Sequence, residues 1–283
     1  DCMGAYGVAI TGHRNQRVNN AIKNQIDKII SVHSSFYNKT RENFLETISH
    51  VAPKNLSNVY LGNSGTEAIE AAIKFSRKYT GKKGMIAMKG SYHGRTMGSL
   101  SLTFTPKYKK SFEPMVENTQ FSEFGNITDL ESKINSETGF IILEPIQGES
   151  GIHPAPDGFL QQVRKLCDEK NIVLVFDECT SGFRESFGGI HMSYNIEPDI
   201  AMYGKTLGNG YAITAVVGKR AIMEAAQSTF ISSTFWTERI GSVAALKSLE
   251  IMERTKSWKI VSKKGNMIKD GWRNLASKYD LPI

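Results

Sequence analysis

The chain has 283 residues, of which 40% are hydrophobic, 10% aromatic and 22% charged. This length suffices for the buried core of one or two domains, and the ordinary balance of apolar and charged residues argues against disorder or a fibrous repeat. The net charge of +7 comes from basic residues scattered in twos and threes, so a solvated basic surface is the first interpretation and a nucleic-acid-binding module the weaker one.

Short apolar runs alternate with helical patterns along the chain and predict an α/β fold with a mainly parallel sheet flanked by helices. The run from residue 139 to 176 forms one strand–helix–strand unit, and the two long charged helices that follow residue 237 are expected to lead the chain away from the sheet. In chain order we predict helices 18–31, 41–50 and 66–79, strands 83–88 and 139–144, helix 157–170, strands 172–176, 199–203 and 213–217, and helices 220–227, 238–253 and 257–278.

Polar residues follow three of these strands directly. Glu144, the pair Asp177–Glu178 and Lys205 all come just after an apolar run. In open α/β sheets, ligands bind outside the carboxyl ends of the strands. We therefore expect these side chains to converge on one rim of the sheet.

Lys205 lies in a glycine-rich turn. Its Gly-Lys-Thr triplet resembles part of a P-loop, but the required earlier glycine is replaced by Asp199 and more glycines follow instead of a helix. A partly buried lysine in such a turn can act as a Schiff-base nucleophile. A solvated loop lysine is the alternative, and this segment alone favours it.

Asp177 follows a strand that is apolar throughout, so its carboxylate needs a cationic partner. A protonated pyridine nitrogen is one such partner, as in enzymes that use pyridoxal phosphate as an electron sink. A magnesium ion, or a helix cap made together with Glu178, are the alternatives.

The segment Ser64-Gly65-Thr66 precedes a helical run and can bind an anion. Gly65 permits close backbone approach, Thr66 offers a hydroxyl group, and the amides that follow point toward an anion such as phosphate. An ordinary helix N-cap with Glu67 in the first turn explains the same residues equally well.

The segment from Tyr92 to Arg95 follows strand 83–88. Tyr92 can stack on a flat ring and Arg95 can bind a carboxylate, whereas His93 is expected to be packed or hydrogen-bonded, not catalytic. An anion cradle, an aromatic ring, an acid and a lysine thus follow in order on one rim. Together they indicate a pyridoxal phosphate site.

At these residues the sequence resembles the class III aminotransferases, which have the fold type I architecture of pyridoxal phosphate enzymes. The first two thirds resemble the acetylornithine, ornithine and carrier-linked lysine branch, and the last third resembles glutamate-1-semialdehyde aminomutases. The resemblance covers nearly the whole chain and is carried by residues 63–68, 92–95, 144–149, 177–178, 182–183, 197–200, 204–205 and 233–234.

The resemblance implies roles around the cofactor pyridoxal 5′-phosphate. Lys205 would bind it covalently and move a proton, Asp177 would face its pyridine nitrogen, and Tyr92 would stack on its ring. Residues 64–66 would bind the phosphate together with Thr234 of a neighbouring subunit, which implies a homodimer with a shared site. No metal is implied.

Further residues match the family's substrate and cofactor contacts. Thr180 takes the place of a glutamine that contacts the cofactor's ring hydroxyl, with a side chain too short for that contact. Arg95 matches an arginine that binds the substrate α-carboxylate, and Tyr6 and Ser233 fall at substrate-contacting positions. Glu149 matches a glutamate that screens a further arginine, so that one pocket takes both amine donor and 2-oxoglutarate.

The function that the resemblance implies is an aminotransferase that moves the distal amino group of an acetylornithine-, ornithine- or lysine-like amino acid to 2-oxoglutarate by a ping-pong mechanism. An aminomutase of the glutamate-1-semialdehyde type, or a truncated protein that binds the cofactor without turnover, are the alternatives. The predicted parts are a partial N-terminal segment (1–50), a cofactor-binding large domain (51–253) and the start of a C-terminal region (254–283) whose small domain is missing.

Location and partners are also constrained by the sequence. No stretch of about 18 apolar residues exists, so we expect neither a transmembrane helix nor a membrane partner. The first residues lack the pattern of a signal peptide. Cys2, Cys167 and Cys179 are far apart and form no CxxC pair, which argues against a disulfide scaffold or a zinc site and predicts a cytoplasmic protein.

Overall fold

The computed structural model describes residues 1 and 3–282, so the prediction for Cys2 lies outside the described residues. Cys167 and Cys179 are both free thiols. None of the described helices combines the length and the hydropathy that a bilayer span requires.

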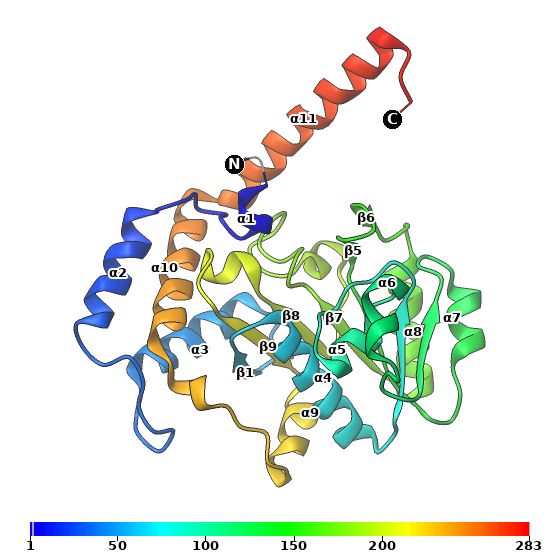
Figure 1. Ribbon diagram of the computed structural model, residues 1–283, viewed down its shortest axis with the longest axis horizontal. Helices are drawn as coiled ribbons and strands as arrows, with labels where there is room; N and C mark the ends of the chain where they lie inside the picture. The colour runs from blue at the N-terminus through cyan, green and yellow to red at the C-terminus, as the bar shows by residue number, and fades with distance from the viewer. Residues whose placement is uncertain (2, 283) are drawn as a thin grey trace.

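The described residues form a seven-stranded sheet with the order β1-β9-β8-β7-β4-β2-β3 (Figure 1). The five strands from β8 to β3 in that order run parallel, which confirms the predicted α/β class. The strands are β1 (Asn58–Gly62), β2 (Gly84–Met88), β3 (Thr119–Ser122), β4 (Thr138–Leu143), β7 (Val173–Asp177), β8 (Ile200–Tyr203) and β9 (Thr214–Gly218), with a separate hairpin of β5 (Ile146–Gln147) and β6 (His153–Pro154).

Strand β9 runs antiparallel to both β8 and β1, although the apolar run 213–217 has the pattern expected of a parallel strand covered on both faces. Residues 204–213, which join β8 to β9, hold only the short 3₁₀ helix η3 (Lys205–Gly208). A parallel connection needs a longer crossover, usually a helix. The continuous apolar pattern of β9 arises because all five of its residues are buried.

Helices cover both faces of the sheet, as predicted (Figure 1). On one face, α4 and α9 pack on alternate residues of the strands, among them Ile142 and Val175. On the other, α7 and α8 cover Ile141 and its neighbours, while α3 and α10 cover β8 and β9. These helices are α3 (Lys39–Val51), α4 (Gly65–Thr80), α7 (Ile127–Lys133), α8 (Phe159–Lys170), α9 (Arg220–Ala225) and α10 (Arg239–Thr255).

The expectation that both C-terminal helices lead away from the sheet is wrong for the first of them and correct for the second. Helix α10 packs against α2 (Gln16–Ile26) and α3, and its Ala245 and Leu249 are buried in the core. Only α11 (Ser257–Tyr279) projects from the body of the molecule (Figure 1). The charge of α10 misled the prediction, because its lysine and acids occupy a narrow solvent face while small and apolar residues fill the rest.

The short elements were not predicted, because they hold too few residues to show a period. Several of them lie near the carboxyl edge of the parallel strands and therefore shape the candidate site. They are α1 (Gly4–Gly7), α5 (Met97–Leu102), α6 (Pro106–Lys109) and the 3₁₀ helices η1 (Lys110–Phe112), η2 (Ile190–Tyr194), η4 (Ala226–Ser228) and η5 (Thr234–Thr237).

Candidate active site

A cavity of about 370 Å³ lies where the parallel strands end. It brings together eight of the predicted site residues, which come from four separate parts of the chain. His93, Gly94, Cys179 and Gly204 complete its wall. The eight predicted residues are Ser64, Gly65, Thr66, Tyr92, Arg95, Asp177, Thr180 and Lys205.

Lys205 is held at the end of β8 in an uncommon backbone conformation. Its φ of 34° lies in the left-handed region, which side chains other than glycine rarely adopt. The Nζ atom donates to Oγ1 of Thr180 at 2.6 Å. Lys205 is nevertheless exposed, so the partial burial expected of a nucleophilic lysine is not seen, and the nucleophile interpretation stays a prediction.

Asp177, the last residue of β7, is buried, and its side-chain partner in this chain is His93. The two side chains lie 2.8 Å apart, and the amide of Cys179 donates to the other carboxylate oxygen at 3.1 Å. Burial alone raises the pKa of Asp177, but the hydrogen bond and charge of His93 outweigh burial and hold that pKa below its usual value. The carboxylate is therefore ionised at neutral pH.

Glu144 is a second buried acid of the same rim. Burial, with the nearby charge of Asp177, raises its pKa to about 7, although His93, the amide of Tyr92 and Lys205 oppose the shift. The same rim thus holds an ionised carboxyl group, Asp177, and one that titrates near neutral pH, Glu144, an arrangement typical of reactive sites.

The expected convergence on one rim is wrong for Glu178. Its side chain is fully buried and turns away from the cavity. It accepts hydrogen bonds from Ser181 Oγ, from the amides of Ile190 and His191, and lies 2.6 Å from Nδ1 of His191. Successive side chains of an extended chain point to opposite sides, so the residue after Asp177 faces the core.

The start of α4 combines both roles predicted for it. Ser64 is the N-cap, and Glu67 accepts from Ser64 Oγ at 2.9 Å. The Thr66 hydroxyl faces a second cluster of hydroxyl groups, 2.8 Å from Oγ1 of Thr96 and 2.6 Å from Oγ of Ser99. The helix N-terminus and these hydroxyl groups form one donor-rich wall that suits an anion.

Gly94 keeps this wall open. Its φ is 128°, and a Cβ atom there would lie 2.7 Å from the hydroxyl oxygens of both Thr66 and Ser99. A side chain at this position is therefore excluded by contact as well as by backbone conformation.

Four predicted site residues do not line this cavity. Tyr6 is 82% exposed on α1, whose Gly7 carbonyl accepts from Arg184. Ser233 and Thr234 lie at η5, where the Ser233 hydroxyl caps the amide of Phe235. Glu149, the fourth, lines a neighbouring cavity together with Tyr92 and Arg95.

The prediction missed several residues that line the cavity or contact its lining. Glu144 was expected on the rim but not counted among the site residues, and His93 was expected to be hydrogen-bonded without an assigned partner. Thr96 and Ser99 gave no signal beyond a local run of hydroxyl residues, because their contact with Thr66 depends on how α4 and α5 pack.

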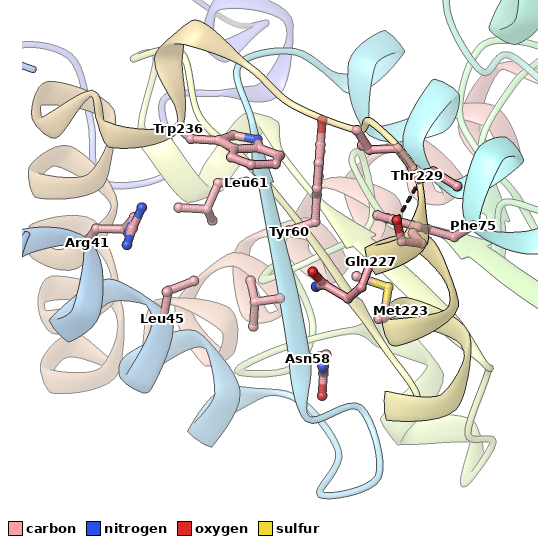
Figure 2. A pocket seen from close by; sticks show the side chains of 13 residues that line it. Arg41, Leu45, Asn58, Tyr60, Leu61, Phe75, Met223, Gln227, Thr229 and Trp236 are labelled. Atoms are coloured by element: carbon pink, nitrogen blue, oxygen red, sulfur yellow. Dashed lines mark hydrogen bonds between the residues drawn. The ribbon is translucent and has the colours of Figure 1, made fainter. Parts of the chain in front are cut away.

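A separate hollow of about 340 Å³ lies against the edge strand β1, away from the predicted residues. Figure 2 shows Arg41 from α3, Tyr60 from β1 and Trp236 from η5 around it. The ring of Tyr60 packs edge-on against Trp236 and Phe75, at 5.4 and 5.5 Å between ring centres. None of its lining residues is a lysine or an acid, so it lacks the amine and the carboxylate found in the first cavity.

Comparisons with known proteins agree with this geometry. The sequence profile of the family described as aminotransferase class-III matches residues 1–282. The [LysW]-aminoadipate semialdehyde/glutamate semialdehyde transaminase of Sulfolobus acidocaldarius is 38% identical over 260 residues, which cover 92% of this chain and 67% of that protein. The acetylornithine aminotransferase of Methanopyrus kandleri is 36% identical over 238 residues, covering 83% of this chain and 61% of that protein.

Solved structures share the fold. An ornithine aminotransferase from Toxoplasma gondii has a TM-score of 0.89 at 24% identity and covers 96% of this chain and 67% of its own. A PLP-bound amine transaminase from an uncultivated Pseudomonas species has a TM-score of 0.92 at 21% identity, covering 98% and 72%. This chain thus spans roughly two thirds of the length of the proteins it matches.

Proposed function

The chain belongs to the class-III aminotransferase family, and on that basis we propose that it moves the distal amino group of an acetylornithine-, ornithine- or lysine-like amino acid to an oxo acid. We take 2-oxoglutarate as the acceptor, with two half-reactions in a ping-pong sequence. The cofactor of this family is pyridoxal phosphate, and the fold is the predicted fold type I architecture.

One observation carries the proposal. In a single cavity, a lysine amine that donates a hydrogen bond to a hydroxyl group lies with a buried acid whose pKa is held low by a histidine. The same cavity includes the N-terminus of α4, which suits an anion. An amine, a carboxylate and an anion cradle are the three groups that a phosphorylated pyridine aldehyde requires.

The residues present fit this cofactor. Thr66 and the first amides of α4 would hold its phosphate, Asp177 its pyridine nitrogen and Lys205 its aldehyde carbon, while Tyr92 forms a wall. The bound cofactor supplies an electron sink for the carbon that loses a proton. Because Asp177 is ionised at neutral pH, it stabilises a protonated pyridine nitrogen.

Residues of this chain carry out the proton transfers. Lys205 accepts a proton from the substrate carbon and returns it, because its amine is the base that lies within the cavity. Thr180 orients the amine through the 2.6 Å hydrogen bond to Nζ. His93 keeps Asp177 charged and fixed in place during each cycle.

The remaining predicted residues have roles that need substrate or a second subunit. Arg95 would bind the substrate carboxylate, Tyr6 would contact it from the N-terminal segment, and Glu149 would screen a further arginine. Ser233 and Thr234 would reach the cavity of a neighbouring subunit in a homodimer, because in their own chain they lie away from it.

Absorption spectroscopy tests the function. Purified protein with added pyridoxal phosphate is expected to show a near-visible band that disappears with N-acetylornithine or ornithine and returns with 2-oxoglutarate. Glutamate must appear in the same amount. A band that responds to an amine while no 2-oxoglutarate is consumed would indicate an aminomutase, and a band that never responds would reject the aminotransferase assignment.

A further inference from the structure

The hollow beside the edge strand β1 takes no part in the proposed function, and we call it the β1 hollow. Among the described residues, none lines both this hollow and the cavity that contains Lys205. Figure 2 shows Arg41 on one side of β1 and Gln227 and Thr229 on the other, so the hollow follows the edge of β1 that faces away from β9. Gln227 and Thr229 are exposed, and the hollow therefore opens to solvent.

Two buried N–H groups of the β1 hollow have no hydrogen-bond acceptor in the part of the chain that the structure describes. They are Nε of Arg41 and Nε1 of Trp236. Arg41 donates to Glu42 at 3.3 Å through Nη2, which leaves its Nε without an acceptor. Buried donors of this kind destabilise the folded protein, so an acceptor that enters the hollow from outside removes a cost.

Tyr60 supplies a third donor to the β1 hollow. Burial raises the pKa of its hydroxyl group above the usual value, and the facing indole of Trp236 only partly opposes that shift. The hydroxyl group is therefore protonated at neutral pH and can donate a hydrogen bond. Three donors, one of them cationic, suit an anionic acceptor such as a carboxylate.

The rest of the β1 hollow is aromatic and aliphatic. The ring plane of Tyr60 meets those of Trp236 and Phe75 at 88° and 79°, and Leu61 and Met223 add aliphatic surface. Edge-to-face packing of this kind favours a further aromatic ring. The volume of about 340 Å³ lies near the lower end of the range for ligand sites, which limits the occupant to a small molecule.

We propose that the β1 hollow is a binding site for a small aromatic carboxylate. Arg41 and the indole N–H of Trp236 bind the carboxylate, and the ring of the ligand packs against Tyr60 and Phe75. Because neither Lys205 nor any other residue of the first cavity takes part, this site is independent of amino transfer.

Two matched compounds test the site. Phenylacetate and 2-phenylethanol share a ring and a two-carbon chain and differ in the carboxylate. In titration calorimetry of the protein with pyridoxal phosphate, we expect phenylacetate to bind about 10-fold more tightly, because its hydrogen bonds are charge-assisted. Arg41→Gln is expected to abolish this preference. Arg95→Gln, which changes the arginine of the first cavity, is the control and is expected to preserve it.

Tryptophan fluorescence locates the bound ligand without the Arg41 variant. The chain has three tryptophans, of which Trp236 lines the hollow, Trp258 stacks on Phe187 and Trp272 lies on α11. Phenylacetate is expected to change the fluorescence of the wild type and of Trp272→Phe saturably, but not that of Trp236→Phe.

Three outcomes would overturn the assignment, whether or not the protein transfers an amine. They are equal affinities for the two compounds, a preference that survives Arg41→Gln or disappears in Arg95→Gln, and a fluorescence change that persists in Trp236→Phe.

Discussion

Nδ1 of His93 lies 2.8 Å from Oδ2 of Asp177, and both side chains are buried beneath the cavity that contains Lys205. The residues are 84 positions apart in the chain, so the contact exists only in the folded protein. It supplies the partner that a buried carboxylate requires and explains why the pKa of Asp177 falls despite burial.

Replacing His93 by phenylalanine leaves Asp177 buried without its partner. Loss of one member of a buried charged pair costs about 3 kcal/mol or more. We expect this loss in the free energy of unfolding from denaturant titration of the cofactor-free protein at pH 7. His50→Phe, at an exposed histidine on α3, serves as the control and is expected to change stability little. Equal stabilities of the two variants would contradict the role of His93.

Glu144 gives the protein a pH dependence of predictable sign. Its pKa is about 7 in the folded state and 4.5 when unperturbed, so the folded state holds more protons between these values. Stability is therefore lost as the pH rises from 4.5 to 7, by about 3 kcal/mol for an isolated group.

Glu144→Gln removes this titration. Relative to the wild type, the variant is expected to gain stability as the pH rises from 5 to 8, measured by denaturant titration without cofactor. Glu149→Gln, at an exposed acid five residues on, is the control and is expected to follow the wild type. A constant difference between Glu144→Gln and wild type at all pH values would show that Glu144 does not titrate in this range.

Lys205→Ala removes the amine that would bind the cofactor covalently. After incubation with pyridoxal phosphate and reduction with borohydride, mass spectrometry is expected to find the cofactor mass on the wild type and on Lys83→Ala, but not on Lys205→Ala. The far-ultraviolet circular dichroism of all three is expected to agree, because the Lys205 side chain is exposed and its hydrogen bond joins it to another side chain, Thr180. Cofactor mass retained by Lys205→Ala would reject this lysine.

Mixing two inactive variants tests the shared site. Thr234→Glu would repel the phosphate of the partner's cofactor, and Lys205→Ala disables the lysine of its own chain. In a mixed dimer the two defects fall in one site, and the other site is intact. Activity is therefore expected to rise on refolding the variants together. No recovery, with mixed dimers shown by mass spectrometry, would mean that Thr234 serves its own chain or none.

The sequence predicted the sheet best where strands are buried on both faces. Residues 140–143 and 172–176 are apolar throughout because α4 covers one side and α8 the other. Strand β1 escaped prediction because it is an edge strand whose Tyr60 is only partly buried. The direction of β9 also escaped, since apolar content reports burial and not strand direction.

The cavity residues that the sequence predicted correctly lie at the end of a strand or at the start of a helix. Asp177, Lys205 and Thr66 occupy such positions, and their local sequence indicated anion, acid and amine chemistry. His93 and Ser99 depend on packing between distant segments, which no local pattern reports. For Glu178 the local pattern predicted too much. It directly follows Asp177 and was expected on the rim, but its side chain faces the core.

The short connection between the antiparallel strands β8 and β9 also has an evolutionary consequence. Residues 204–213 must close the distance between two neighbouring strands, so an insertion there would displace Lys205. Residues 103–118, which carry Lys107 and Tyr108, run between α5 and β3 without such a constraint. Length changes in that segment can remodel the neighbouring cavity lined by Glu149, Lys107 and Tyr108 while Lys205 stays in place. Related chains with different substrates are therefore expected to differ most between residues 103 and 118, and least between 204 and 213.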